Sequence, residues 1–521
     1  MPFARPGMTW SDPKLMARVR ARPDLVAIAI LLVVSLAIRL RFLSRPLHGD
    51  EMISFSNMVL GRDFTGILFG PFDSNSHLLN SLIMKAVYLV AGESPALMRL
   101  PNLVFALLAI VLLYWFGSRE FGRVVGYSAA LILSLHPAMV LYSVSTRGYA
   151  GMVLFTLVSS ILLLQVLIEF SWRRLFLCSL TGFLACAFHL FSVNVLIAQA
   201  VLVVLVIAWP EKGGSESLRV RALRFGPVIL GPAIALALLF AISLPSMRHG
   251  FGAGSDFFFQ SAFPVALVNF LGGCRYRTDP DVFSIMLLAL TAAGFFGLSK
   301  NRMLGFYAGL MFLSPLSLYV LSFFAPVFTL HPRFFVFLLP FSCLLFLVGL
   351  QHAARLGSTR TGDGRLGSGW VAAATCLCVV VAAVFFARIE VPRGNRALIR
   401  AQKAVGEYVD SHPETRLLTN DTGFVRVRLR QERNMDRIRP ALGIIAINEY
   451  LEQHPDGAVD YIYVPQKRYT AADLIHYKGE VPPEVKYQRD ERLRNFLNDN
   501  ATLELDLAPM LQIYTLRPPS G

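Results

Sequence analysis

The sequence predicts a polytopic α-helical membrane protein, and three observations support that fold class. The chain of 521 residues is 55% hydrophobic, with a mean hydropathy of +0.54. Only 16% of its residues are charged, whereas soluble domains carry about a quarter. The apolar residues gather in runs of about 20, the length that an α-helix needs to cross about 30 Å of hydrocarbon. The surplus of apolar side chains therefore belongs in lipid.

About eleven runs are long enough to span a bilayer. They are residues 24–43, 99–117, 124–143, 148–168, 175–191, 193–209, 226–245, 281–298, 303–325, 333–351 and 369–387. The first run follows a basic N-terminus but no small-residue cleavage site follows it, so we expect an uncleaved span. Segment 77–91 is shorter and amphipathic, with Asn80, Ser81 and Lys85 on its polar face. It predicts a helix lying in the membrane interface.

Basic residues predict the orientation of these spans. With eleven spans, the short connections rich in arginine and lysine all fall on the side of the basic N-terminus. That side is cytoplasmic by the positive-inside rule, so the loops 44–98 and 246–280 and the segment 388–521 are external. The same bias accounts for the net charge of +15, and we expect no nucleic-acid partner.

We expect two domains, a transmembrane module over 1–387 and an extracytoplasmic α/β domain over 388–521. Residues 398–409 have a helical period. The predicted strands are Val425–Leu429, Asp460–Val464 and Leu503–Leu507. This C-terminal part has no glycine-rich phosphate loop and no His/Cys cluster, which favours a supporting role.

An acidic pair, Asp50–Glu51, follows the first span within a few residues. One interpretation is that the two carboxylates cap a helix that begins near Met52, since acids favour helix N-termini. The other is that a carboxylate held at the lipid boundary acts as a general base. The two interpretations are compatible, and they make Asp50 and Glu51 the candidate catalytic residues.

The external loops also supply cations. Arg147 and Arg333 each lie at the outer end of an apolar run, His331 stands two residues before Arg333, and Lys85 lies in the interfacial segment. Either arginine alone could simply extend to lipid headgroups. Together, on the same predicted side as an acidic pair, these cations favour a site that binds a lipid phosphate beside a general base.

This combination suits one reaction in particular. When a sugar linked through phosphate to a membrane polyprenol is transferred, a base must take the proton of the acceptor hydroxyl. Fixed positive charge stabilises the departing phosphate, which needs no general acid. One carboxylate with several cations is thus a sufficient minimal set.

At this point the chain resembles the membrane-embedded type C glycosyltransferases, in the branch that contains the protein O-mannosyltransferases and the lipid A aminoarabinose transferase. The resemblance covers roughly residues 25–350. Its four parts are His48-Gly49-Asp50-Glu51, the segment Gly92-Glu93-Ser94 leading to Arg99-Leu100-Pro101, Arg147-Gly148-Tyr149, and Pro332-Arg333-Phe334 with Pro340. Where the family has His-Pro-Pro-Leu, this chain reads His77-Leu78-Leu79.

The resemblance implies an inverting glycosyltransferase of the cell envelope that uses a polyprenyl-phosphate sugar donor. Asp50 resembles the catalytic base and Glu51 its partner, whereas Arg147, Tyr149 and Arg333 resemble contacts to the lipid phosphate or the sugar. The acceptor would be a lipid, a glycan or a protein. The active site would face the periplasm or exterior of the cytoplasmic (inner) membrane. No further carboxylate stands near Arg147, where some relatives place a metal ligand. A divalent metal therefore stays open but is not supported by the sequence, and no other cofactor is predicted.

Two other functions stay open. A transporter or flippase of a lipid-linked substrate would place ionisable residues in mid-membrane, often within repeated halves; here the spans carry few central charges and no internal repeat. A non-enzymatic scaffold would leave the external cations unexplained. The loop 246–280, with glycines beside the aromatic run Phe257–Phe259, suits either a mobile cover or an interfacial anchor.

Overall fold

The computed structural model describes part of the chain. The described residues are 22–45, 47, 51, 54–70, 77–92, 94–208, 218–241, 302–321 and 332–358, together with strands and single residues of the C-terminal part. The chain divides into two compact units. The first comprises Met1–Ser44, Phe64–Gly252 and Asp256–Arg388, and the second comprises Arg45–Asp63, Ala253–Ser255 and Ile389–Gly521.

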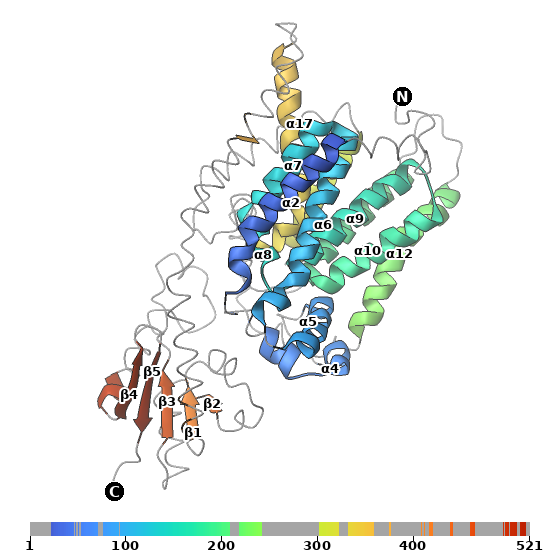
Figure 1. Ribbon diagram of the computed structural model, residues 1–521. Coiled ribbons are helices and arrows are strands. Elements are labelled where there is room, and N and C mark those ends of the chain that lie inside the picture. Colours follow the sequence, from blue (N-terminus) through green and yellow to red (C-terminus); the bar gives the residue numbers. More distant parts are fainter. Residues whose placement is uncertain are drawn as a thin grey trace. The chain divides into compact units, whose positions relative to one another are not determined.

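The first unit is helical (Figure 1). Its helices are α2 Arg22–Leu43, α4 Phe64–Phe69, α5 Leu78–Ala91, α6 Pro95–Phe121, α7 Arg123–Leu135, α8 Pro137–Ser143, α9 Tyr149–Ile168, α10 Trp172–Phe188, the 3₁₀ turn η2 Leu190–Ser192, α11 Val193–Ala208, α12 Leu218–Ala241, α16 Arg302–Leu321, the 3₁₀ turn η4 Pro332–Leu338 and α17 Leu339–Ser358. Helix α6 packs against α2, α7 and α9, and α9 packs against α10.

Polar contacts join α2 to its neighbours at both ends. At its start, Asp24 accepts a hydrogen bond from the Tyr114 hydroxyl (2.9 Å) and pairs with Arg123 (3.0 Å). Towards its end, the fully buried Arg39 donates from Nε to Ser143 Oγ (2.7 Å) and from Nη1 to the Ser134 carbonyl (2.9 Å). Because an unsatisfied polar group in hydrocarbon costs several kcal/mol, these bonds fix α2 against α6, α7 and α8.

The apolar helices confirm a multi-pass membrane protein. Among the described residues, five helices are long and apolar enough to cross a membrane, or six if a bent pair counts as one span. The five are Asp24–Leu43, Pro95–Phe121, Tyr149–Ile168, Leu190–Ala208 and Phe334–Gln351. The predicted spans 226–245 and 303–325 correspond to helices with shorter apolar stretches, Ala222–Ile234 and Gly305–Val320. Span 281–298 falls outside the described residues, and span 369–387 does so except for residues 373, 375 and 376. The number of eleven spans therefore stays a prediction.

The predicted span 124–143 is not one straight helix. It is broken into α7 and α8, which meet at an angle of 61°. The break lies at His136, whose ψ of 126° is extended, because a proline at the next position disfavours the helical conformation of the residue before it. Pro137 then takes the first position of α8, where its missing N–H costs no hydrogen bond.

The interfacial segment forms α5, but with a different burial from the one that we expected. Its 14 residues span about 21 Å, too short to cross the hydrocarbon. Asn80 and Ser81, on the predicted polar face, are buried in the protein, whereas Val90 on the apolar face is 90% exposed. The polar face therefore serves the interior of the unit and leaves apolar side chains for lipid.

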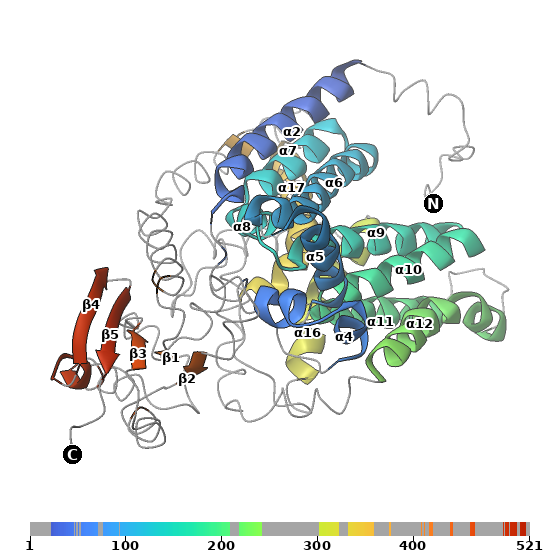
Figure 2. The same cartoon turned by 60° about the horizontal axis from the view of Figure 1, so that its bottom comes forward.

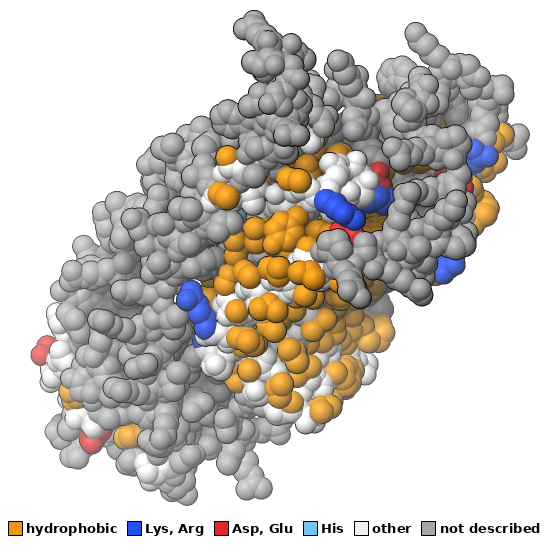
Figure 3. Space-filling model, turned by 45° about the horizontal axis from the view of Figure 1, so that its top comes forward, with side chains coloured by type: hydrophobic (Ala, Val, Ile, Leu, Met, Phe, Trp, Pro, Cys, Tyr) orange, Lys and Arg blue, Asp and Glu red, His pale blue; other side chains and the backbone are white. Residues whose placement is uncertain are grey.

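Small residues let α6 and α7 pack closely. A Cβ at Gly126 would lie 2.2 Å from the backbone nitrogen of Ser118, and one at Gly117 would lie 2.9 Å from the Cα of Gly126. Glycine at such contacts lets membrane helices approach each other closely. On the outer surface, exposed hydrophobic side chains cover a broad area of one face (Figure 3), as lipid contact requires.

The second unit contains a five-stranded sheet in the order β2-β1-β3-β5-β4 (Figure 2). The strands are β1 Arg416–Thr419, β2 Ile438–Pro440, β3 Val459–Tyr463, β4 Ala501–Leu507 and β5 Leu511–Leu516. β1 pairs in parallel with β2 and β3, and β5 pairs antiparallel with β3 and β4. The predicted strands at Asp460–Val464 and Leu503–Leu507 are therefore confirmed, whereas Val425–Leu429 lies outside the described residues.

A carboxylate is buried in this sheet. Asp460 on β3, 3% exposed, accepts from Thr515 Oγ1 (2.7 Å), its partner in register on β5, and from the Tyr408 hydroxyl (2.9 Å). Burial of Tyr408, together with its hydrogen bond to Asp460 and the charge of that carboxylate, raises the pKa of the phenol above its usual value. Two hydroxyl donors thus satisfy a buried acid, which ties β3 to β5.

Candidate active site

The candidate site of the first unit surrounds Arg147, in the connection between α8 and α9. Arg147 is only 5% exposed, so its side chain points into the protein and does not extend to lipid headgroups. Its Nε donates a hydrogen bond to Nε2 of His77 (2.9 Å). Its guanidinium carbon lies 5.4 Å from the ring centroid of Tyr149, a cation–π contact. The structure therefore brings the predicted residues Arg147 and Tyr149 together and adds His77 to them.

The contacts of His77 define its protonation. Its Nδ1 lies 3.2 Å from the Phe188 carbonyl oxygen at the end of α10. A carbonyl oxygen only accepts and an arginine Nε–H only donates, so in this arrangement Nδ1 carries the proton and Nε2 offers its lone pair. His77 is thus a neutral imidazole that joins Arg147 to the backbone of α10.

Aromatic rings enclose this pair. The ring centroid of His77 lies 4.6 Å from that of His189 and 5.6 Å from that of Tyr149, and His189 and Tyr149 are 4.7 Å apart. Beyond His189, Phe191 stacks on Phe334 of η4 at 4.1 Å. The rings remove His77 from water and surround the Arg147 cation with low-dielectric groups, which strengthens its electrostatic interactions.

Two buried asparagines hold the backbone that carries Arg147. Asn80 of α5 donates to the Thr146 carbonyl (2.7 Å), and Asn102 of α6 donates to the Ser145 carbonyl (2.9 Å) and to Asn80 Oδ1 (2.9 Å). The carbonyls before Arg147 are thereby satisfied without regular secondary structure. Asn80 is buried because the polar side of α5 bonds to the connection between α8 and α9.

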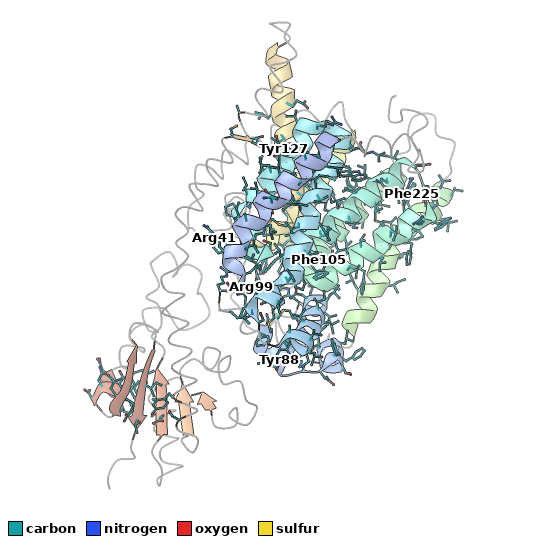
Figure 4. All side chains as sticks on the ribbon, viewed as in Figure 1. Arg41, Tyr88, Arg99, Phe105, Tyr127 and Phe225 are labelled. Atoms are coloured by element: carbon teal, nitrogen blue, oxygen red, sulfur yellow. The ribbon has the colours of Figure 1, made fainter. Side chains whose placement is uncertain are left out.

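The Arg-Gly-Tyr sequence permits a close approach of α10. A Cβ at Gly148 would lie 2.2 Å from the Phe188 carbonyl oxygen, and a Cβ at Gly151 would lie 2.5 Å from the Phe188 ring. That ring also packs on Phe155 (5.5 Å) and on Phe105 (5.0 Å), which is labelled in Figure 4. Both glycines therefore let Phe188 present its carbonyl to His77.

The other predicted site residues either lie in other segments of the chain or fall outside the residues that the structure describes. Lys85 of α5 is half-buried, with its Nζ 5.6 Å from the ring centroid of Tyr88, labelled in Figure 4. Glu51 is buried at 4% exposure and belongs to the second unit, just before the helical turn η1 Phe55–Leu60. Asp50 and His331 fall outside the described residues, and for Arg333 only the backbone, in η4, is described. The roles of all these residues therefore stay predictions.

Sequence reasoning did not assign a role to His77, Asn80, Asn102 or His189. A signal existed for His77, since it stands where the resembling family has a histidine, directly before the interfacial helix. For the asparagines, the signal was a polar residue on an otherwise apolar helix, which indicates a buried polar contact in membrane proteins. Among the residues that the structure describes, no group of three or more His, Cys, Asp or Glu side chains could hold a metal ion.

Another buried arginine, Arg99, lies near the start of α6. Arg99, labelled in Figure 4, is fully buried and donates from Nη1 to the Leu43 carbonyl (2.8 Å) at the end of α2. Helix α6 itself begins at Pro95 behind the N-cap Ser94, whose hydroxyl accepts from the Leu97 N–H. Arg99 of the Arg-Leu-Pro sequence therefore satisfies one of the carbonyls that the end of α2 leaves without a partner within the helix.

No protein-family model and no curated protein sequence matches this chain. Solved structures do match it. ArnT from Cupriavidus metallidurans in the apo state is 11% identical with a TM-score of 0.55, and ArnT bound to undecaprenyl phosphate is 12% identical with a TM-score of 0.53; each match covers 94% of this chain and 97% of ArnT. The oligosaccharyltransferase of Archaeoglobus fulgidus, in complex with Zn and sulfate, is 11% identical over 88% of this chain and 71% of its own, with a TM-score of 0.51. The resemblance seen in the sequence is confirmed, and the chain has the fold of the type C membrane glycosyltransferases.

Proposed function

We propose that this protein is an inverting glycosyltransferase that moves a sugar from a polyprenyl-phosphate donor to an acceptor at the extracytoplasmic face of the cytoplasmic membrane. The observation that carries the proposal is Arg147, a buried cation oriented by a neutral histidine in the fold of ArnT. ArnT has been solved with undecaprenyl phosphate bound. A lipid phosphate is the anion that an arginine beside a membrane span is suited to bind.

The proposed reaction is a single displacement. Asp50 takes the proton of the acceptor hydroxyl, and the acceptor oxygen attacks the anomeric carbon of the sugar while the bond from that carbon to the phosphate oxygen breaks. The attack comes from the face opposite the leaving group, so the anomeric configuration inverts. Polyprenyl phosphate leaves as an anion, and no proton has to be supplied to it.

The chain's own residues support this reaction in separate roles. Arg147 stabilises the negative charge that grows on the phosphate as the bond breaks, a form of electrostatic stabilisation that strengthens where water is excluded. Tyr149 holds the guanidinium by its ring. We assign Lys85, His331 and Arg333 to further contacts with the phosphate or the sugar, and Glu51 to support of Asp50.

The orientation of the protein is also part of the proposal. The basic short connections lie on one side when the predicted eleven spans are threaded, and the positive-inside rule makes that side cytoplasmic. The acidic pair and Arg147 then belong to loops on the other side. A cysteine placed at Asp63, in the same predicted loop as the acidic pair, should react with a membrane-impermeant thiol reagent added outside intact cells when the six native cysteines have been replaced by serine. Labelling only after the cells are opened would contradict this orientation.

The direct experiment is product analysis. Purified protein in liposomes is incubated with a panel of undecaprenyl-phosphate sugars and with lipid, glycan and peptide acceptors. We expect one donor to yield glycosylated product with release of undecaprenyl phosphate, and Arg147→Lys to lower turnover by about 10²-fold because lysine lacks the planar fork of arginine. The matched control is Arg123→Lys, on an exposed arginine paired with Asp24. Translocation of the donor without any product would instead identify a transporter.

A further inference from the structure

We propose that His77 is a positioning residue for Arg147, and that it holds the arginine only while its imidazole is neutral. The inference rests on the proposed function, in which Arg147 binds the phosphate of the donor. It adds a built-in loss of phosphate binding when His77 becomes protonated. The observation that carries it is the pair of hydrogen bonds from His77 to Arg147 Nε and to the Phe188 carbonyl.

The bond at Nε fixes the plane of the guanidinium. Arginine binds phosphate best through N–H groups of that plane, in a fork of fixed geometry. A partner at Nε, together with the Tyr149 ring at 5.4 Å, holds the plane in one orientation before the donor arrives. His77 therefore organises the phosphate contact without having to touch the phosphate.

The position of His77 is in turn set by three elements. The Phe188 carbonyl comes from α10, Tyr149 starts α9, and His189 precedes η2, with its ring 4.6 Å from that of His77. His77 itself is 3% exposed. Few rotamers of an imidazole satisfy both hydrogen bonds inside such an enclosure, so the neutral Nδ1–H form is the one that fits.

Protonation breaks this arrangement. A protonated His77 carries hydrogen on both ring nitrogens, so its Nε2–H would face the Nε–H of Arg147 at 2.9 Å. Two N–H donors and two positive charges then face each other where there was one hydrogen bond, so the Arg147 guanidinium must leave its orientation beside His77. The titratable groups around His77 include Arg147, Tyr149 and His189.

The substitutions separate positioning from simple packing. Gln at position 77 offers a carbonyl oxygen that accepts from Arg147 and cannot titrate, whereas Phe keeps an aromatic ring, somewhat larger than imidazole, and removes both hydrogen bonds. We expect His77→Phe to weaken binding of undecaprenyl phosphate by about 10²-fold near neutral pH, taking the loss of rate that a misplacement of about 1 Å causes as the scale. On acidification the difference from the wild type should shrink, because the wild type then loses the same arrangement. His77→Gln should stay within a few-fold of the wild type near neutral pH and should lose the fall in affinity that the wild type shows on acidification.

The readout is the affinity of the full-length protein in nanodiscs for undecaprenyl phosphate, measured across the acid range. Titration of the phosphate itself is common to all variants, so a difference between the wild type and His77→Gln reports on His77. A ¹⁵N-histidine NMR spectrum of the wild type provides a second measurement that needs no variant to fold. We expect a neutral Nδ1–H tautomer for His77, and its protonation at the pH where affinity falls.

Each outcome has one meaning. Identical pH profiles for the wild type and His77→Gln, unchanged binding in a folded His77→Phe, or an Nε2–H tautomer would each overturn the positioning role. A wild type that binds undecaprenyl phosphate but shows any of these results leaves the proposed function standing. A wild type that binds none at any pH removes the proposed donor class, and the inference falls with it.

Discussion

The close approach of α10 to the Arg147 connection can be tested by adding a single methyl group. In Gly148→Ala the new Cβ would stand 2.2 Å from the Phe188 carbonyl oxygen, whereas real Cβ contacts are essentially never shorter than 3.0 Å. The two backbones must therefore separate by about 0.8 Å. A movement of that size is large for a hydrogen bond that already measures 3.2 Å between His77 Nδ1 and the same oxygen.

The expected consequence is a loss of turnover in a protein that still folds. A displacement of nearly 1 Å in a positioning group costs about 10²-fold in turnover, while overpacking by one methyl group costs about 1–3 kcal/mol of folding free energy. The assay is single-turnover transfer with the donor found in the panel, alongside thermal unfolding in detergent. Gly305→Ala is the matched control, because a Cβ there meets nothing within 4 Å. A folded Gly148→Ala protein with wild-type turnover would refute the proposed link from Gly148 through Phe188 to His77.

Three further predictions concern stability. Arg39→Lys should lower the free energy of unfolding by about 1–2 kcal/mol, because lysine cannot reproduce the hydrogen bonds from both Nε and Nη1. Thermal unfolding measures the effect, with the exposed Arg41→Lys as the control. Equal melting temperatures for the two variants would contradict it. Gly126→Ala should cost about 1–3 kcal/mol by forcing α6 and α7 apart, and an unchanged melting temperature would show that the two helices yield freely. The folded state raises the pKa of Tyr408, so its hydrogen bond to Asp460 contributes stability that is complete below the unfolded pKa of about 10. This contribution is lost as pH rises through the folded pKa. Tyr408→Phe should therefore reduce the loss of melting temperature at alkaline pH, and the same pH dependence in variant and wild type would rule out this contribution.

The helices were predictable because lipid imposes a simple rule on sequence. A span needs about 20 apolar residues, and the runs that became α2, α6, α9 and α11 follow this rule closely. The bend between α7 and α8 was missed, although Pro137 was visible, since hydrophobicity alone does not report a break in the backbone. The strands at Asp460–Val464 and Leu503–Leu507 could be predicted from β-branched and alternating residues.

The site was harder to predict, because its key contacts join residues far apart in sequence. The Arg-Gly-Tyr pattern marked Arg147, but nothing local indicated that His77, 70 residues earlier, would accept its Nε–H. The burial of Asn80 was also missed, since amphipathicity shows that a helix has two faces and not which of them meets protein. A polar face that looks suited to water can instead satisfy buried carbonyls, as Asn80 does for Thr146.

We propose above all that Asp50 is the base of a transfer reaction from a polyprenyl-phosphate sugar. The most direct measurement compares Asp50→Asn with Asp63→Asn, a nearby exposed carboxylate, by single-turnover transfer and by separate measurement of undecaprenyl-phosphate binding. We expect Asp50→Asn to bind the lipid phosphate as the wild type does but to form no product, and we expect Asp63→Asn to do both. Product formation by Asp50→Asn at the wild-type rate would contradict it.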